Sequence, residues 1–238
     1  MFLLEQRNRK LKKVWTDDGN AIRLSSIKRI EKLKNNEVIN DKRSFWDFYH
    51  IEKAKNYTPR NLLFFTIQDC TVLKEDEIIL NRYLYLESHI KEFNQLFEIP
   101  DSEIIFLGQP LCKDNFVTPQ SYNEYLRKFA EMFPNSKIIY YMHPEENEKR
   151  WLDEYSCSRF DIRKNNVAFE VIAMNLKPRS IIASFFTSSL VNLSKLNLDM
   201  QFYSLFLNEI KDVNNIYEQA LIRDYTYFET LGIKVLKF

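Results

Sequence analysis

Three short polar clusters in this chain combine residue types that could carry acid–base and phosphate chemistry. Two adjacent carboxylates, Asp17 and Asp18, precede a glycine, and one of them could accept a proton from a substrate. His143 ends an apolar run and is followed at once by Pro144. Three hydroxyl side chains follow another apolar run at residues 187–189. Together the clusters could supply a base, an imidazole and an anion site.

Each cluster also has a purely structural interpretation. An Asp-Gly dipeptide is common in turns, so Asp18 could serve the fold alone. His143 could be hydrogen bonded to a backbone carbonyl at a strand edge. Thr187, Ser188 and Ser189 could cap a helix, or their hydroxyls and the free N–H groups of the helix N-terminus could hold a phosphate. The residues by themselves leave these alternatives open.

The elements that position the clusters follow a regular pattern from residue 103 onward. Short continuous apolar runs, typical of buried strands, alternate with segments of helical spacing. This alternation predicts an α/β fold with a Rossmann-like parallel sheet and helices on both faces. Strands are expected at 103–111, 136–144, 179–186 and 201–207, and helices at 121–134, 165–176, 187–196 and 215–225.

The carboxyl ends of parallel strands form the ligand crevice of such sheets. Gly108 and Gln109, His143, and the hydroxyl cluster each follow an expected strand, and so do Asp17 and Asp18. We expect these four segments to form the site. The pattern before residue 103 is less regular. It predicts strands at 12–15 and 61–67 and helices at 25–34, 43–54 and 81–96.

The composition excludes several classes of site. With only three glycines, the chain has no Gly-rich phosphate loop of the Walker or dinucleotide type. A net charge of +1 gives no general argument for nucleic acid as a partner. The chain has neither a D-x-D pair, nor a HExxH motif, nor a Cys-His cluster, so we expect no metal.

Three widely spaced cysteines, Cys70, Cys112 and Cys157, predict free thiols in a reducing compartment. The apolar runs are too short to cross a bilayer, and the N-terminus lacks a signal-peptide core. We therefore expect a cytoplasmic protein. The basic cluster at residues 7–13 is compatible with a solvated surface or with peripheral association at the inner face of the cell membrane.

The ordered set of motifs resembles the bacterial sialyltransferases. An acidic pair with glycine, then His-Pro, then a Ser-Ser pair recur in those enzymes, and the segments FLGQPL, YYMHPEE and SFFTSSLVNL are most similar to glycosyltransferase family 52, the lipooligosaccharide and capsule sialyltransferases. The resemblance spans residues 14–195. It implies a GT-B architecture and a metal-independent, inverting transfer of sialic acid from CMP-sialic acid to a galactose-terminated glycan, with no further cofactor.

The same resemblance implies roles for individual residues. Asp17 would be the general base, with Asp18 as the less favoured choice. His143 would contact the CMP phosphate, as acid or as electrostatic stabiliser. The donor would also be bound by the following residues: Gly108, Gln109 and Pro144 along the nucleotide, Thr187, Ser188 and Ser189 at the phosphate, and Glu170 at the ribose or cytosine.

Two features depart from the family pattern. Glu145 and Glu146 follow His-Pro, where the family usually has a basic residue. Only 16 residues precede Asp17, where family members carry a whole acceptor-binding half. We therefore expect an N-terminally shortened enzyme, in which residues 1–100 are a remnant of the acceptor-side domain and residues 101–238 form the CMP-sugar donor domain.

Two other functions fit the same residues. The chain could be a non-catalytic nucleotide-binding remnant, or a structural or interaction module whose motifs are ordinary turns and caps. A sheet left half covered would also be a solubility liability. For that reason we expect self-association into a homo-oligomer.

Overall fold

The chain is seen here in a computed structural model that divides it into two compact units, residues 1–82 and 83–238. The structure describes residues 13–16, 26, 29–30, 62–67, 69–70, 72–84, 88–89, 102–113, 115–146, 151–164, 167–196, 198–208 and 215–238, of which 13–16 and 215–220 are described by their backbone alone. The two units are described separately below. Asp17, Asp18 and the helix predicted at 43–54 lie outside the described residues.

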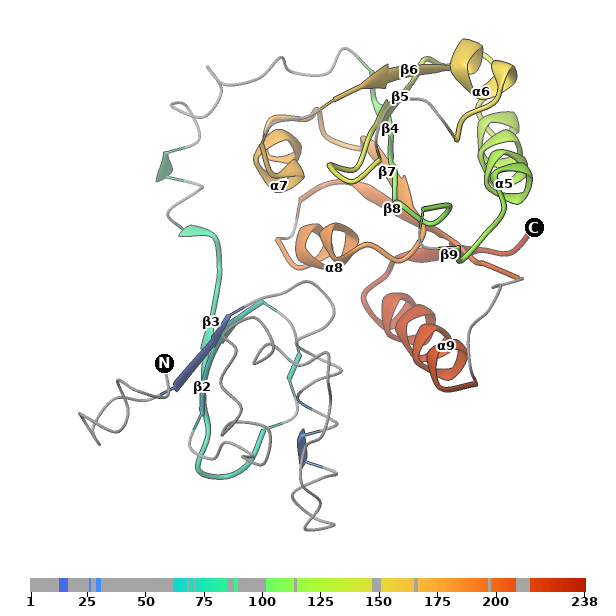
Figure 1. Cartoon of the computed structure of the whole chain (residues 1–238). Helices are drawn as coiled ribbons and strands as arrows, with labels where there is room; N and C mark the ends of the chain where they lie inside the picture. Colours follow the sequence, from blue (N-terminus) through green and yellow to red (C-terminus); the bar gives the residue numbers. More distant parts are fainter. Residues whose placement is uncertain are drawn as a thin grey trace. The chain divides into compact units, whose positions relative to one another are not determined.

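A six-stranded, all-parallel sheet forms the centre of the second unit (Figure 1). Its strands are β4 (Ile104–Leu107), β5 (Ile138–Tyr141), β6 (Phe160–Arg163), β7 (Ile181–Ser184), β8 (Gln201–Leu205) and β9 (Lys234–Leu236). Their order across the sheet is β6-β5-β4-β7-β8-β9. Counted along the chain this is 3-2-1-4-5-6, the strand order of Rossmann sheets. The predicted α/β fold is therefore confirmed.

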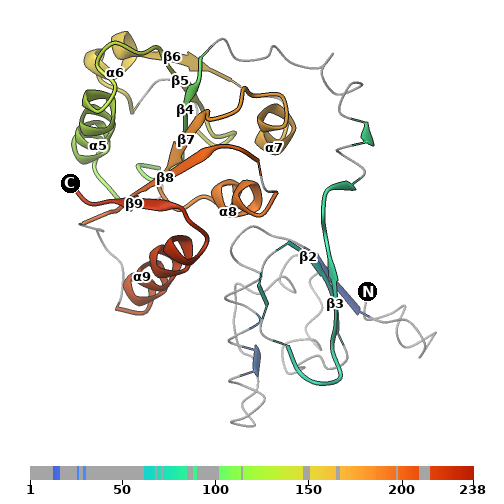
Figure 2. The same cartoon turned by 180° about the vertical axis from the view of Figure 1, so that it is seen from behind.

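Helices cover both faces of this sheet, as the turned view also shows (Figure 2). They are α5 (Pro119–Glu131), α6 (Glu154–Arg159), α7 (Phe169–Ala173), α8 (Ser188–Ser194) and α9 (Asn215–Thr230). Along β4, Ile104 and Phe106 pack in the core beneath α5, while Ile105 and Leu107 pack in the core with α7, α8 and α9. Because both faces are buried, the central strands β4 and β5 are apolar at every position rather than alternating.

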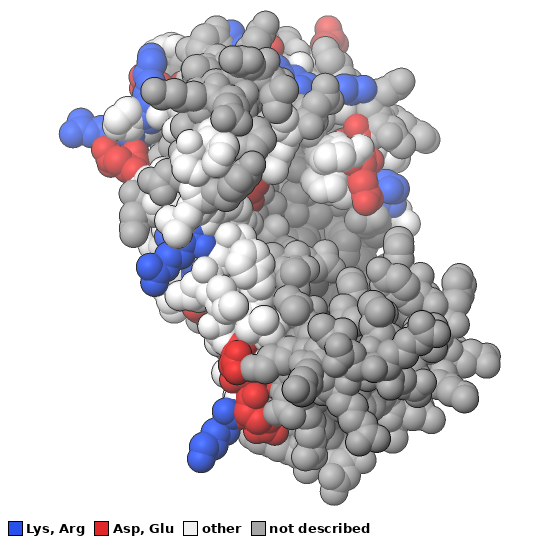
Figure 3. All heavy atoms as spheres, turned by 90° about the vertical axis from the view of Figure 1, so that its left-hand side faces the viewer, with Lys and Arg blue, Asp and Glu red and all other residues white. Residues whose placement is uncertain are grey.

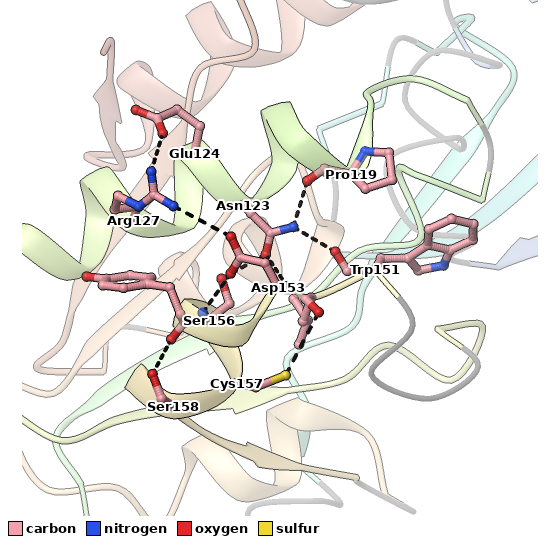
Figure 4. A network of polar contacts seen from close by, with 11 residues as sticks. Pro119, Asn123, Glu124, Arg127, Trp151, Asp153, Ser156, Cys157 and Ser158 are labelled. Carbon is pink, nitrogen blue, oxygen red and sulfur yellow. Dashed lines mark hydrogen bonds and ion pairs between the residues drawn. The ribbon is translucent and has the colours of Figure 1, made fainter.

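A buried amide joins α5 to α6 (Figure 4). The Asn123 Nδ2 group donates to the carbonyls of Pro119 at 2.6 Å and Trp151 at 2.7 Å. Its Oδ1 accepts from the Asp153 backbone N–H at 2.9 Å and from the Ser156 hydroxyl at 2.8 Å. Asn123 thus satisfies groups from both helix starts at once, and Asp153 in turn caps α6 by accepting from the Ser156 N–H at 2.8 Å.

The structure adds elements that the sequence did not predict. These are β3, β6, β9 and the six-residue helix α6. The helix predicted from residue 121 begins earlier, at Pro119, because Thr118 caps it by accepting from the Ser121 N–H at 3.0 Å and proline suits the first helical position. It ends at Glu131, three residues before the predicted end.

The first unit contains a three-stranded parallel sheet, β1-β2-β3. Its strands are β1 (Lys13–Thr16), β2 (Leu62–Thr66) and β3 (Glu77–Leu80). A buried ion pair lies beside them: the Arg29 guanidinium donates to both carboxylate oxygens of Asp76, at 2.7 and 2.9 Å. Asp76 also accepts the backbone N–H groups of Leu62 and Leu73, so it connects β2, the turn before β3 and the helical residue Arg29.

None of the three cysteines forms a disulfide; Cys112 is buried and the other two are half-buried. Within the described residues, the structure has no helix of the length and apolarity that a bilayer crossing requires. Lys and Arg side chains are interspersed with Asp and Glu on the described part of the face drawn in Figure 3.

Candidate functional site at the carboxyl edge of the six-stranded sheet

Three polar loops meet where β5, β4 and β7 end side by side. Gly108 and Gln109 follow β4, His143 follows β5 with one residue between, and Thr187 follows β7 after two phenylalanines. The strand order reverses between β4 and β7, and ligands of open α/β sheets bind at such a switch point. The structure therefore brings three of the four predicted segments to one edge of the sheet, and the fourth, Asp17–Asp18, lies outside the described residues.

The Gln109 side chain joins the loops on either side of the switch point. Its Oε1 accepts the Phe186 backbone N–H at 2.9 Å and lies 3.4 Å from the Ser184 hydroxyl. Ser184 in turn donates to the Leu107 carbonyl at 2.7 Å. The amide oxygen of Gln109 thus holds the loop that leads to the hydroxyl cluster.

His143 begins a tight turn whose backbone and ring are both fixed. Its carbonyl accepts the Glu146 N–H at 2.9 Å, and its own N–H donates to the Glu146 Oε2 at 2.7 Å. The ring Nδ1 accepts the Glu145 backbone N–H at 3.1 Å. This contact assigns the ring proton of the neutral imidazole to Nε2.

The two glutamates after His-Pro have opposite environments. Glu145 is exposed and pairs with Lys113 at 2.8 Å, and that ion pair lowers its pKa. Glu146 is buried, with 7% of its surface exposed. Burial raises the pKa of Glu146 to about 7, against the opposing effect of the hydrogen bonds from Tyr140, His143 and Tyr122. Of the two carboxyl groups after His-Pro, that of Glu145 is therefore paired with Lys113, and that of Glu146 is buried in the core.

A buried tyrosine pair holds Glu146. The Tyr140 hydroxyl donates to Oε1 at 2.6 Å, and the Tyr122 and Tyr140 hydroxyls lie 2.6 Å apart. Gly108 makes room for this cluster, because a Cβ there would overlap the Glu146 carboxylate and the Tyr140 hydroxyl. Gly108 also donates its N–H to the Tyr141 carbonyl at 2.8 Å, which ties β4 to β5.

The remaining predicted residues have structural contacts of their own. Thr187 is the N-cap of α8, and its side chain accepts the Ser189 N–H at 3.4 Å. Ser188 and Ser189 open this seven-residue helix and are half-buried. Glu170 is buried in α7 and accepts a 2.9 Å hydrogen bond from Asn192 of α8. Pro144 is exposed.

Sequence reasoning did not identify Glu146, Tyr140 or Tyr122 as site residues. The signal available was the glutamate pair after His-Pro, which we interpreted as a departure from the family rather than as part of the turn. In the described part of the chain, no cluster of three or more His, Cys, Asp or Glu side chains could hold a metal ion. The predicted bases Asp17 and Asp18 lie outside the described residues.

The fold and the converging loops define a Rossmann-like α/β protein with a polar switch-point edge. Residues 20–206 of the chain match the alpha-2,8-polysialyltransferase (POLYST) family, and the chain belongs to that family. It is therefore a sialyltransferase-family protein, which confirms the broader part of the predicted resemblance. Searches of curated proteins and of solved structures give no significant match.

Proposed function

We propose that this protein transfers sialic acid from CMP-sialic acid to a glycan acceptor, and that the donor nucleotide binds at the carboxyl edge of the six-stranded sheet. The observation that carries the proposal is the convergence of the Gln109, His143 and Thr187 loops at the Rossmann switch point in a member of a sialyltransferase family. Gly108, Pro144 and Glu170 complete the proposed donor site.

The proposed chemistry follows the residue types at this edge. A sialyl transition state is oxocarbenium-like, and the departing CMP phosphate gains negative charge. The Nε2–H of His143 and the hydroxyls of Ser188 and Ser189 would donate hydrogen bonds to that phosphate, which stabilises the leaving group without metal. Asp17 would accept the proton of the acceptor hydroxyl from the opposite side, giving inversion, with Asp18 as the alternative base.

Two acceptors fit this proposal. The family name points to an α-2,8 linkage, which requires the O8 hydroxyl of a terminal sialic acid. The likeness of the motifs to glycosyltransferase family 52 favours instead a galactose-terminated lipooligosaccharide or capsule glycan. Transfer assays with a sialic-acid-terminated and a galactose-terminated oligosaccharide, run side by side, would decide between them.

The experiment that tests the donor site is calorimetric titration of CMP into the full chain without added metal. We expect saturable binding that weakens in His143→Ala and is unchanged in His89→Ala. His89 is the matched control, because its Nδ1 also has a hydrogen-bond partner, the Ser88 hydroxyl at 2.8 Å. Absence of CMP binding by the folded wild-type chain would contradict the donor site and favour a structural or interaction module.

Transfer assays on the same proteins separate the donor site from the base. Asp17→Asn should still bind CMP but lose about 10²–10⁴-fold in transfer rate, the usual contribution of a positioned general base. If the wild-type chain binds CMP yet transfers to neither acceptor, it is a nucleotide-binding remnant. If Asp18→Asn shows the loss and Asp17→Asn does not, the base is Asp18.

A further inference from the structure

The buried carboxyl of Glu146 is bonded at both oxygens, and one of its donors is the backbone of His143. Oε2 accepts the His143 N–H at 2.7 Å. Oε1 accepts the Tyr140 hydroxyl at 2.6 Å and lies 3.4 Å from the Tyr122 hydroxyl. The Tyr122 hydroxyl also accepts the Gln109 backbone N–H at 3.3 Å. A single carboxyl group therefore connects the turn after β5, helix α5 and the loop after β4.

The orientation of the His143 ring depends on the turn that Glu146 closes. The Glu146 backbone N–H bonds the His143 carbonyl, and the Glu146 side chain bonds the His143 N–H. The same turn carries the Glu145 N–H that meets the ring Nδ1 at 3.1 Å. Loosening the carboxyl would therefore release the backbone that sets both the position and the tautomer of the imidazole.

We propose that Glu146 is a positioning residue that acts through His143: its carboxyl locks the His-Pro turn so that the imidazole presents Nε2–H to the ligand at the sheet edge. The proposal rests on the function proposed above, in which that ligand is the donor phosphate. A carboxylate suits this role better than an amide, because both of its oxygens accept a hydrogen bond here while glutamine has only one acceptor oxygen.

The Glu146 carboxyl in this turn also changes its protonation state near neutral pH, because burial raises its pKa to about 7. Among the described residues, the titratable groups that face it are the Tyr140 hydroxyl from β5, the Tyr122 hydroxyl from α5 and, at longer range, the Cys112 thiol from the loop after β4. Burial raises the pKa of both tyrosines well above 10 and that of Cys112 to about 12, so these groups stay neutral. Glu145 on the same turn is paired with Lys113.

The direct test is nitrogen-15 NMR of the histidine rings in the full chain. The chain has three histidines, and His143→Ala assigns the His143 signal. In the wild-type protein we expect the neutral His143 ring to be the Nε2–H tautomer, because Nδ1 accepts the Glu145 N–H. In Glu146→Gln we expect the tautomer populations to become mixed. Unchanged His143 spectra in Glu146→Gln would overturn the proposal.

The kinetic test separates positioning from fold stability. We expect Glu146→Gln to lower kcat about 10- to 100-fold, as misplacement of a reacting group does, to weaken CMP binding by less than His143→Ala does, and to alter the pH–rate profile near pH 7. The matched control is Ser102→Ala, which removes buried hydrogen bonds to the Lys137 carbonyl and the Ile104 N–H at the opposite end of β4. An equal loss of kcat in Ser102→Ala would contradict a specific role for Glu146.

A second variant keeps the proposal testable if Glu146→Gln does not fold. Tyr140→Phe removes the donor at Oε1 but leaves the His143 bond at Oε2, so its effects on the NMR shifts and on kcat should have the same direction and be smaller. An unchanged His143 spectrum in Tyr140→Phe would contradict the coupling of Tyr140 to His143 through the Glu146 carboxyl. Because the NMR measurement needs no substrate, failure of the wild-type chain to bind CMP would overturn the proposed function and leave the coupling of Glu146 to His143 independently measurable.

Discussion

Gly108 has no side chain because two buried groups occupy the space that a Cβ would need. The Glu146 carboxylate and the Tyr140 hydroxyl both lie where a Cβ would be, and the φ of Gly108 is not in the left-handed region. The conformational freedom of glycine is thus not what this position requires. Gly232 is the opposite case, with φ of +78° and open space around it.

We expect Gly108→Ala to lower the free energy of unfolding by about 1–3 kcal/mol through overpacking. Tyr140→Phe removes one of the overlapping atoms, so the double variant should lose less than the sum of the two single losses. Denaturant unfolding of the four proteins measures this coupling. If the two single losses of unfolding free energy simply add in the double variant, the added methyl group does not contact the Tyr140 hydroxyl.

The sequence could not show which glutamate of the HPEE segment is part of the site. Both follow proline and have the same chemistry, and only the fold decides that Glu145 faces Lys113 while Glu146 faces the tyrosines. His143 was predictable because an apolar strand leads directly to it. Glu146 was not, since its partners Tyr140 and Tyr122 look like ordinary core residues at strand and helix spacing.

At the scale of elements, Asn123 is the residue on which the packing of α5 against α6 depends. Asn123→Ala would remove the hydrogen bonds that Asn123 makes to two carbonyls, one backbone N–H and one hydroxyl. Because each buried polar group left unsatisfied is costly, we expect a loss of about 2–4 kcal/mol in the free energy of unfolding. Ser158→Ala, which removes one exposed bond to the Tyr155 carbonyl, should change it by less than about 0.5 kcal/mol. Equal losses in thermal or urea unfolding would contradict this.

The elements that sequence reasoning found and missed differ in burial. The central strands β4, β5 and β7 are buried on both faces; β4 and β5 are continuous apolar runs, and β7 differs from them in its last residue, Ser184. The missed strands β3, β6 and β9 lie at sheet edges and are three or four residues long, and each begins with or contains charged residues. An edge strand is defined by one hydrogen-bonded neighbour, which a local pattern records weakly: of the four edge strands of the two described sheets, β1 was predicted and the other three were not. For the same reason, the sheet order 3-2-1-4-5-6 required the structure.

At the scale of the whole molecule, each of the two units contains a buried carboxyl, and the pKa values of these two carboxyls are shifted in opposite directions. Burial alone would raise the pKa of Asp76 in the first unit, but hydrogen bonds from Arg29, Leu73 and Leu62 outweigh burial and lower it. In the second unit burial prevails and raises the pKa of Glu146 to about 7. Burial and hydrogen bonding thus shift the two pKa values in opposite directions, because Asp76 has a cationic partner, whereas the donors that the structure describes around Glu146 are neutral.

These opposite shifts predict that the two units respond differently to acid. A raised carboxyl pKa means that the folded state binds a proton more tightly than the unfolded chain, so the second unit should gain stability as the pH falls from 8 to 5. For Glu146 the gain is at most about 3 kcal/mol, from a shift of 4.5 to about 7. The lowered pKa of Asp76 stabilises the first unit above its unfolded value of 3.8, and this contribution is lost as the pH falls below it.

Amide hydrogen exchange of the full chain, resolved by peptide and corrected for intrinsic rates, can follow both units in one sample. Between pH 8 and 5 we expect the exchange protection of peptides from 104–146 to rise and that of peptides from 62–80 to stay constant. Below pH 4 the protection of 62–80 should fall.

Two variants separate the two responses. Glu146→Gln should remove only the rise in protection of 104–146 between pH 8 and 5. Asp76→Asn, which removes the carboxylate paired with the buried Arg29, should lower the protection of 62–80 already at pH 8. If the rise in protection of 104–146 persists in Glu146→Gln, another group in the second unit titrates between pH 8 and 5.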